Sequence, residues 1–113
     1  MRFHRCSVTS LTLLCLLLPL AAAERPAAEN YKQHCVECHG RDGKSQTRLG
    51  RKSGAKDLTD KERQAKLTDE DAFNGIKHGR KNSKGEEKME AFGDRLSDRE
   101  ISELVAYIRA FAK

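Results

Sequence analysis

Two cysteines and a histidine in the first third of the chain have a spacing that could do chemistry. Cys35 and Cys38 are separated by two residues, and His39 follows the second cysteine directly. A Cys-x-x-Cys pair can bind zinc or exchange disulfides, and with a following histidine it can attach a haem covalently. The rest of the sequence discriminates among these three chemistries.

Zinc binding and thiol redox chemistry each need partners that this sequence does not offer. Structural zinc takes four ligands, but the chain has no second Cys-x-x-Cys, so His34 or His78 would have to complete the set. On a helix, the adjacent Cys38 and His39 would also point about 100° apart. A thioredoxin-like pair belongs to a βαβ pattern, and no run in the chain alternates like a strand.

The start of the chain predicts export. Arg2 and Arg5 precede a largely apolar run over residues 7–20, and three alanines follow at 21–23. A charged segment, an apolar segment and a small-residue cleavage site form a secretory signal. An uncleaved membrane anchor is the alternative, but the run is shorter than the roughly 20 apolar residues that a span needs. We therefore predict a signal peptide at 1–23, a mature domain at 24–113, a periplasmic location and no stable membrane anchor after cleavage.

The mature chain needs help to fold. Removing the first 23 of 113 residues leaves 90, and loss of Arg2 and Arg5 lowers the formal charge from +5 to +3. Leu, Ile, Val and Phe make up only 13 of these 90 residues, and a domain this small usually needs a staple, a metal or a partner. Cys6 and Cys15 leave with the signal, so no disulfide framework remains. A covalently held haem c, a large apolar disc attached through Cys35 and Cys38, would supply the missing core.

Helical patterns predict an all-α domain around this motif. A helical segment is expected over 27–38, with Pro26 at its first turn. Capping signals predict a short helix after Thr59, a helix from Thr68 to Gly79 with Ala72, Phe73 and Ile76 buried, and a helix after Ser97. The last helix has the strongest period, with apolar residues at Ile101, Leu104, Val105, Ile108 and Phe111. Residues 41–56 and 80–88 are expected to be loops.

One methionine is the favoured second ligand of a haem iron. Met89 is the only methionine of the mature chain and lies 50 residues after His39 in a polar neighbourhood, where a core-filling side chain is less expected. Met/His pairs are a standard haem ligation. His34 is on the same helical segment as His39 and so cannot easily reach the opposite haem face, and His78 points away from the apolar stripe of its helix. We predict His39 and Met89 as axial ligands and His78 as a solvated surface residue.

With this motif, these predicted ligands and these helical segments, the chain resembles the class I mono-haem c-type cytochromes. The resemblance is based on the segments NYKQHCVECHGRDGK (30–44), AKDLTD (55–60), LTDEDAFNGIKHG (67–79) and KMEAFGDRLSDREISELVAYIRAF (88–111). It implies a small helical fold around one haem, with first and last helices that cross at Ala27, Tyr31, Leu104 and Tyr107. Glu90 follows Met89 where this family commonly has Pro, and 41–56 has no Pro to present a carbonyl to His39. The acceptor for the His39 ring is therefore not assigned from the sequence.

Function is predicted from the ligation. With both axial positions filled by protein, the iron has no open site, and Met/His ligation raises the potential. We expect a monomeric, non-enzymatic one-electron carrier. An electron-entry subunit of a larger periplasmic redox enzyme is an alternative, and a haem peroxidase or sensor is another if Met89 is not a ligand.

Charge predicts the kind of partner. Basic residues cluster in two segments that the resemblance places beside the haem edge, and such a field would steer redox proteins with acidic docking surfaces. Ordinary solubility is the alternative, because Asp and Glu are plentiful elsewhere. Nucleic-acid binding is not expected of an exported haem protein with few aromatic residues. The clusters are Arg41, Lys44, Arg48, Arg51, Lys52 and Lys56, and Lys77, Arg80, Lys81, Lys84 and Lys88.

Overall fold

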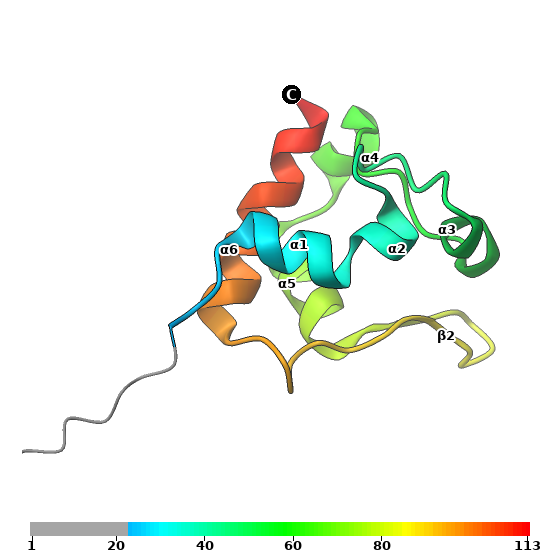
Figure 1. Ribbon diagram of the computed structural model, residues 1–113. Coiled ribbons are helices and arrows are strands. Elements are labelled where there is room, and N and C mark those ends of the chain that lie inside the picture. The colour runs from blue at the N-terminus through cyan, green and yellow to red at the C-terminus, as the bar shows by residue number, and fades with distance from the viewer. Residues whose placement is uncertain (1–22) are drawn as a thin grey trace, which may run out of the picture.

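A computed structural model describes residues 23–113, so the predicted signal segment, apart from Ala23, lies outside the described residues. The described chain is dominated by helices, as the sequence predicts, with a short hairpin between the last two α-helices (Figure 1). In order, the elements are α1 (Ala27–His34), α2 (Val36–His39), α3 (Arg48–Ser53), α4 (Lys61–Lys66), α5 (Asp69–His78), β1 (Arg80–Lys81), β2 (Glu87–Met89), α6 (Asp98–Arg109) and the 3-10 turn η1 (Ala110–Ala112).

The first and last helices form the centre of the fold. α1 packs across α6, and α5 packs against α6 as well (Figure 1). Tyr31 and Leu104 are buried in this crossing, and the Tyr31 and Tyr107 rings lie 5.2 Å apart between centroids. The predicted helix crossing is therefore confirmed. The buried hydrophobic residues are Tyr31, Ala72, Ile76, Phe92, Leu96, Ile101, Leu104, Val105 and Ile108.

Capping side chains set the starts of the helices. Ser97 accepts from the Glu100 N–H, and the Glu100 carboxylate accepts from the Ser97 N–H, which is the predicted capping box of α6. Thr68 accepts from the Asp71 N–H and starts α5, also as predicted. The prediction for α4 was wrong by one residue, because Asp60 is its N-cap and the Thr59 hydroxyl donates to Asp57 instead.

The expected single helical segment over 27–38 is interrupted. Cys35 has φ −114° and separates α1 from α2, although its N–H still donates to the Tyr31 carbonyl at 2.9 Å. The His39 N–H then donates to the Cys35 carbonyl at 2.8 Å, which restarts the helical bonding. The break turns α2 relative to α1 (Figure 1). Both cysteines nevertheless line the same cavity.

The prediction of an uninterrupted loop over 41–56 was wrong, since α3 lies inside it. Thr47 is the N-cap of α3 and accepts from the Gly50 N–H, while its own hydroxyl lies 2.7 Å from the Glu37 carbonyl and 3.0 Å from that of Cys38. α3 contains a single large apolar residue, Leu49, which is exposed. It is therefore held mainly by hydrogen bonds to the α2 segment, which periodicity cannot reveal.

The all-α fold class is confirmed, but the prediction of a plain loop over 80–88 was wrong. Residues 80–89 form a small antiparallel hairpin, in which Arg80 pairs with Met89. At its turn the Asn82 side chain accepts from the N–H groups of Lys84 and Glu86, and Gly85 has φ 78°. The strands contain two and three residues, too short for an alternating pattern.

Polar bonds fix the far end of α6 to the loops around it. Arg109 donates to the carbonyls of Gln64 and Leu67 and to the Asp69 carboxylate. Gln64 is buried and donates to the carbonyls of Leu58 and Ile108. These bonds hold the segment between α3 and α5 against α6.

No helix within residues 23–113 is long and apolar enough to cross a membrane.

Candidate functional site

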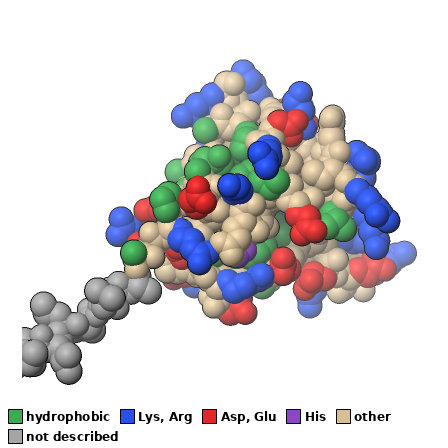
Figure 2. All heavy atoms as spheres, viewed as in Figure 1, with side chains coloured by type: hydrophobic (Ala, Val, Ile, Leu, Met, Phe, Trp, Pro, Cys, Tyr) green, Lys and Arg blue, Asp and Glu red, His purple; other side chains and the backbone are tan. Residues whose placement is uncertain are grey.

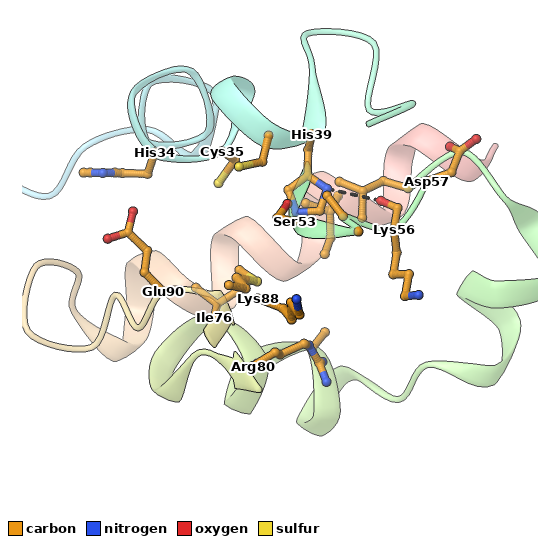
Figure 3. A pocket seen from close by; sticks show the side chains of 18 of the residues that line it. His34, Cys35, His39, Ser53, Lys56, Asp57, Ile76, Arg80, Lys88 and Glu90 are labelled. Carbon is orange, nitrogen blue, oxygen red and sulfur yellow. Dashed lines mark hydrogen bonds between the residues drawn. The ribbon is translucent and has the colours of Figure 1, made fainter. Parts of the chain in front are cut away.

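A cleft of about 780 Å³ opens between the α1–α2 segment and the hairpin (Figure 3). Its volume lies in the range of pockets that hold a cofactor-sized ligand, roughly 300–1,000 Å³. His34, Cys35 and His39 lie on one side of it in the close-up, and Ile76, Arg80 and Lys88 lie on the other. Its apolar lining comes from Leu58, Leu67, Ala72, Ile76, Phe92, Leu104 and Ile108.

Both cysteines of the sequence motif line this cleft as free thiols. Cys35 lies at the junction of α1 and α2, and Cys38 lies within α2. Burial, together with the neighbouring Cys38, raises the pKa of the Cys35 thiol to about 12. The Cys35 thiol is therefore neutral, and both cysteine side chains are half-buried.

His39 ends α2 and has one ring nitrogen engaged. Its Nδ1 lies 3.2 Å from the Lys56 carbonyl oxygen (Figure 3), which can only accept, so Nδ1 carries the proton. Burial lowers the pKa of His39, which favours the neutral ring. A neutral ring protonated at Nδ1 leaves the Nε2 lone pair free to bind a metal. The Lys56 carbonyl is thus one acceptor of the ring proton that the sequence left unassigned.

Met89 is half-buried, lines the same cleft and comes from the opposite side of the fold, at the end of β2. Pairing with Arg80 fixes its backbone. Beyond it, Glu90 forms an ion pair with Arg95 at 2.9 Å, and the Arg95 guanidinium lies 4.5 Å from the centre of the Phe92 ring. Met89 is followed by Glu90 and not by Pro, so the hairpin and the contacts of Arg95 hold this segment in place instead.

The end of α5 holds the Met89 segment in place. The N–H groups of Phe92 and Gly93 donate to two carbonyls in the last turn of α5, those of Ile76 and Lys77, at 2.9 and 3.0 Å. Gly79 has φ 75° and ψ −178°, a conformation nearly confined to glycine, and a Cβ there would lie 2.5 Å from the Met89 carbonyl. The chain can therefore approach Met89 this closely only with glycine at 79.

The other two described histidines differ in position. His34 lines the cleft from the same side as His39 (Figure 3), with its ring edge-on to Phe92 at 5.5 Å. His78 is exposed at the end of α5 and does not line the cleft, so its prediction as a surface residue is confirmed. Within residues 23–113 no group of three or more His, Cys, Asp or Glu side chains could hold a metal ion, so a zinc site of that kind is not formed there.

Comparison with known proteins agrees with this geometry. The family model described as "Cytochrome C oxidase, cbb3-type, subunit III" matches residues 22–108. Among solved structures, the chain is similar to one described as "KustC0563 c-type cytochrome", with a TM-score of 0.68 and 36% identity over 79% of this chain and 100% of that chain. A mutant of Kustc0563 gives a TM-score of 0.66 and 34% identity over 77% of this chain and 99% of that chain. No curated protein matches the chain.

The chain belongs to the c-type cytochrome family. It is an electron-transfer haem protein, and the family implies covalently bound haem c. The residues of the cleft fit that group, because two free thiols, a histidine with a free Nε2 and a large apolar lining surround one space. A methionine thioether on the opposite side completes a donor set typical of haem iron.

Positive charge predominates around the cleft of this cytochrome, although Asp57 and Glu90 also line it. In the space-filling view, Lys and Arg side chains gather along the edge formed by α3 and the hairpin (Figure 2). The predicted clusters only partly face the cleft, and Lys77 instead pairs with Asp98 at 2.8 Å. The predicted basic residues that do not line it are Arg41, Lys44, Arg48, Lys77 and Lys84. The cleft-lining cations are Arg51, Lys52, Lys56, Arg63, Arg80, Lys81 and Lys88.

Sequence reasoning missed two contributors to the site. The Lys56 carbonyl is a backbone group, so no residue type marks it. Ser45 is a buried serine beside His39, with its Oγ 3.0 Å from Nδ1. Its position in a glycine-rich loop gave no signal of burial.

Proposed function

We propose that this cytochrome is an exported, monomeric one-electron carrier with a single haem c attached through Cys35 and Cys38. We further propose that His39 and Met89 are the axial ligands. The observation that carries this proposal is that His39, Met89 and both thiols line one apolar cleft. His39 lies across this cleft from Lys88 and Glu90, the two neighbours of Met89 in the sequence (Figure 3). When bound, haem c supplies a one-electron iron couple.

The residues of the chain would act by holding and shielding that group. The thiols would anchor it on the α2 side, and the bond from His39 to the Lys56 carbonyl would fix the orientation of the imidazole. Met89, held by the hairpin, would close the opposite axial position. With both positions filled, no substrate could reach the iron, which supports a carrier rather than a peroxidase or a gas sensor.

The proposed location is the periplasm, supported by the sequence pattern of residues 1–23. Seven cations and the two acidic side chains Asp57 and Glu90 line the cleft. This excess of positive charge supports docking to redox proteins with acidic surfaces, because such a field steers oppositely charged partners. No role in nucleic-acid binding is proposed.

A second candidate is an electron-entry subunit of a larger redox enzyme. It is favoured by the matching family model, which is described as a subunit of a cbb3-type oxidase. Size-exclusion chromatography of the native protein from its source membrane and periplasmic fractions separates the two. Elution as a monomer supports the carrier, and stable co-elution with an oxidase supports the subunit.

Carbon monoxide binding tests the ligation. The reduced wild-type protein should not bind carbon monoxide, whereas Met89→Ala should bind it and have a lower reduction potential, because the sixth position opens and the thioether is lost. His78→Ala is the matched control, since His78 is exposed and away from the cleft. If His78→Ala opened the iron and Met89→Ala did not, the ligand assignment would be wrong.

Attachment is tested by the intact mass of the purified protein. The wild type should carry the added mass of one haem after denaturation. Cys35→Ala and Cys38→Ala should each give low yields, because a domain with so little apolar core loses part of the group around which it folds. Normal yields of folded, haem-free protein from the double variant would contradict the proposal.

A further inference from the structure

Ser45 has a conformation that its surroundings must enforce. Its φ of 58° makes it the one non-glycine residue with positive φ in the part of the chain that the structure describes. Serine seldom adopts this left-handed region, and residues that do so persist where neighbouring contacts hold them, often at functional sites. Here the Ser45 N–H donates to the His39 carbonyl at 2.8 Å, and the side chain is almost completely buried.

The left-handed backbone places the hydroxyl of Ser45 between two groups of the site. Ser45 Oγ lies 2.6 Å from the Lys56 carbonyl oxygen and 3.0 Å from His39 Nδ1. A carbonyl can only accept, so the hydroxyl proton points to Lys56, and the oxygen lone pairs are left to face the His39 N–H. The His39 proton is therefore shared between two acceptors, the Ser45 oxygen at 3.0 Å and the Lys56 carbonyl at 3.2 Å.

This arrangement differs from a single backbone acceptor in a way that bears on the iron. Hydrogen bonds from the outer nitrogen of a ligating histidine fix the ring orientation and raise its basicity as a ligand. A more basic imidazole stabilises the oxidised iron more than the reduced iron, which lowers the reduction potential. The nearer of the two acceptors here is the Ser45 hydroxyl, and its bond to Lys56 also keeps that carbonyl in place.

We propose that Ser45 is a positioning residue that orients the His39 imidazole and sets the reduction potential of the haem through its shared hydrogen bond. The inference rests on the proposed function, because it requires His39 to be an axial ligand. It assigns to one side chain a role beyond local folding, so loss of the hydroxyl should change a property of the iron.

Two variants remove the hydroxyl in different ways. Ser45→Gly removes it and accepts the left-handed backbone freely, whereas Ser45→Ala removes it and keeps the strained Cβ. The matched control is Ser102→Ala, because Ser102 is exposed on α6, does not line the cleft, and its hydroxyl donates to the Asp98 carbonyl at 2.9 Å. The reduction potential is measured on the haem-loaded fraction, so a lower yield does not hide the result.

Both Ser45 variants should shift the reduction potential upward by similar amounts, and Ser102→Ala should leave it at the wild-type value. In the reduced protein, the His39 Nδ1 proton should exchange with solvent faster in both Ser45 variants, as followed by NMR. If the two variants change only the unfolding midpoint, Ser45 has a merely structural role. If the potential falls, the hydroxyl does not act by raising the basicity of His39. Either result overturns the inference.

Failure of the proposed function would look different. If Met89→Ala left the wild-type spectrum and carbon monoxide binding unchanged, the ligation itself would be wrong, whatever the Ser45 variants do. If the Met89 result is as expected and the potential of Ser45→Gly is unchanged, only the role of Ser45 is wrong.

Discussion

Gly79 offers a sharp test of how the fold positions Met89. An alanine there would take a φ of 75° and ψ of −178°, which costs a non-glycine residue about 1–3 kcal/mol. Its Cβ would also lie 2.5 Å from the Met89 carbonyl and 2.9 Å from the Ala91 nitrogen, so the segment carrying Met89 must move. We therefore expect Gly79→Ala to weaken the bond between the methionine sulfur and the iron as well as to destabilise the fold.

Gly85→Ala is the matched control for the backbone cost. Gly85 has φ 78°, but a Cβ there would meet no atom within 4 Å. Both variants should lower the free energy of unfolding by roughly 1–3 kcal/mol through backbone strain, measured by urea denaturation followed by circular dichroism. Only Gly79→Ala should also let carbon monoxide bind the reduced protein. Equal behaviour of the two variants toward carbon monoxide would refute the proposed role of Gly79 in holding Met89.

Three further changes follow from burial and charge. Leu104→Ala, at a completely buried site, should lower the free energy of unfolding by about 2–5 kcal/mol. Leu49→Ala removes an exposed side chain of α3 and should stay within about 0.5 kcal/mol of the wild type. Equal losses in urea denaturation would contradict the core assignment. Burial and nearby arginines lower the pKa of His34, so its neutral form favours the folded state. The His34 contribution to stability is therefore complete above the unfolded-state pKa, near 6.5, and is lost as pH falls toward the lower folded-state pKa. In His34→Gln the midpoint of unfolding should decrease less steeply as the pH falls below about 6.5. If the midpoint depends on pH as it does in the wild type, His34 is not the cause of that dependence. Charge reversal to Glu at Lys81, Lys84 and Lys88 should slow electron transfer to an acidic partner and make the rate depend less on salt. A wild-type rate that is independent of ionic strength would contradict electrostatic steering.

The helices that the sequence predicts well are those with local signals. The capping box at Ser97 and the cap at Thr68 each contain their own hydrogen-bond partners within three residues, so the sequence shows donor and acceptor together. The apolar period of α6 is equally local, and its inner residues are buried as predicted. Phe111, the last of that series, lies past the end of α6 in η1 and is only half-buried.

The elements that the sequence hides depend on distant contacts or on very short runs. α3 is held by the Thr47 hydroxyl beside the Glu37 and Cys38 carbonyls, a contact that no local pattern predicts. The hairpin has strands too short to alternate, although the Asn82 and Gly85 turn residues were a usable signal. Strong local signals therefore identify the frame, while tertiary hydrogen bonds decide the loops.

The sequence likewise predicts some residues of the candidate site and not others. Side-chain chemistry is visible in the sequence, so Cys35, Cys38, His39 and Met89 could be selected before the structure brought them around one cleft. The partners of the His39 ring could not be selected, because one is a backbone carbonyl and the other is a serine in a left-handed conformation. Such partners depend on the path of the loop rather than on residue type.

The most direct test of the central claim is the absorption spectrum of the oxidised protein in the region of the weak iron–sulfur charge-transfer band. Ligation by His39 and Met89 predicts that the wild type shows this band, that Met89→Ala loses it, and that His78→Ala keeps it. A wild-type spectrum without the band, or a band that survives in Met89→Ala, would contradict the claim that a methionine-ligated haem occupies the cleft.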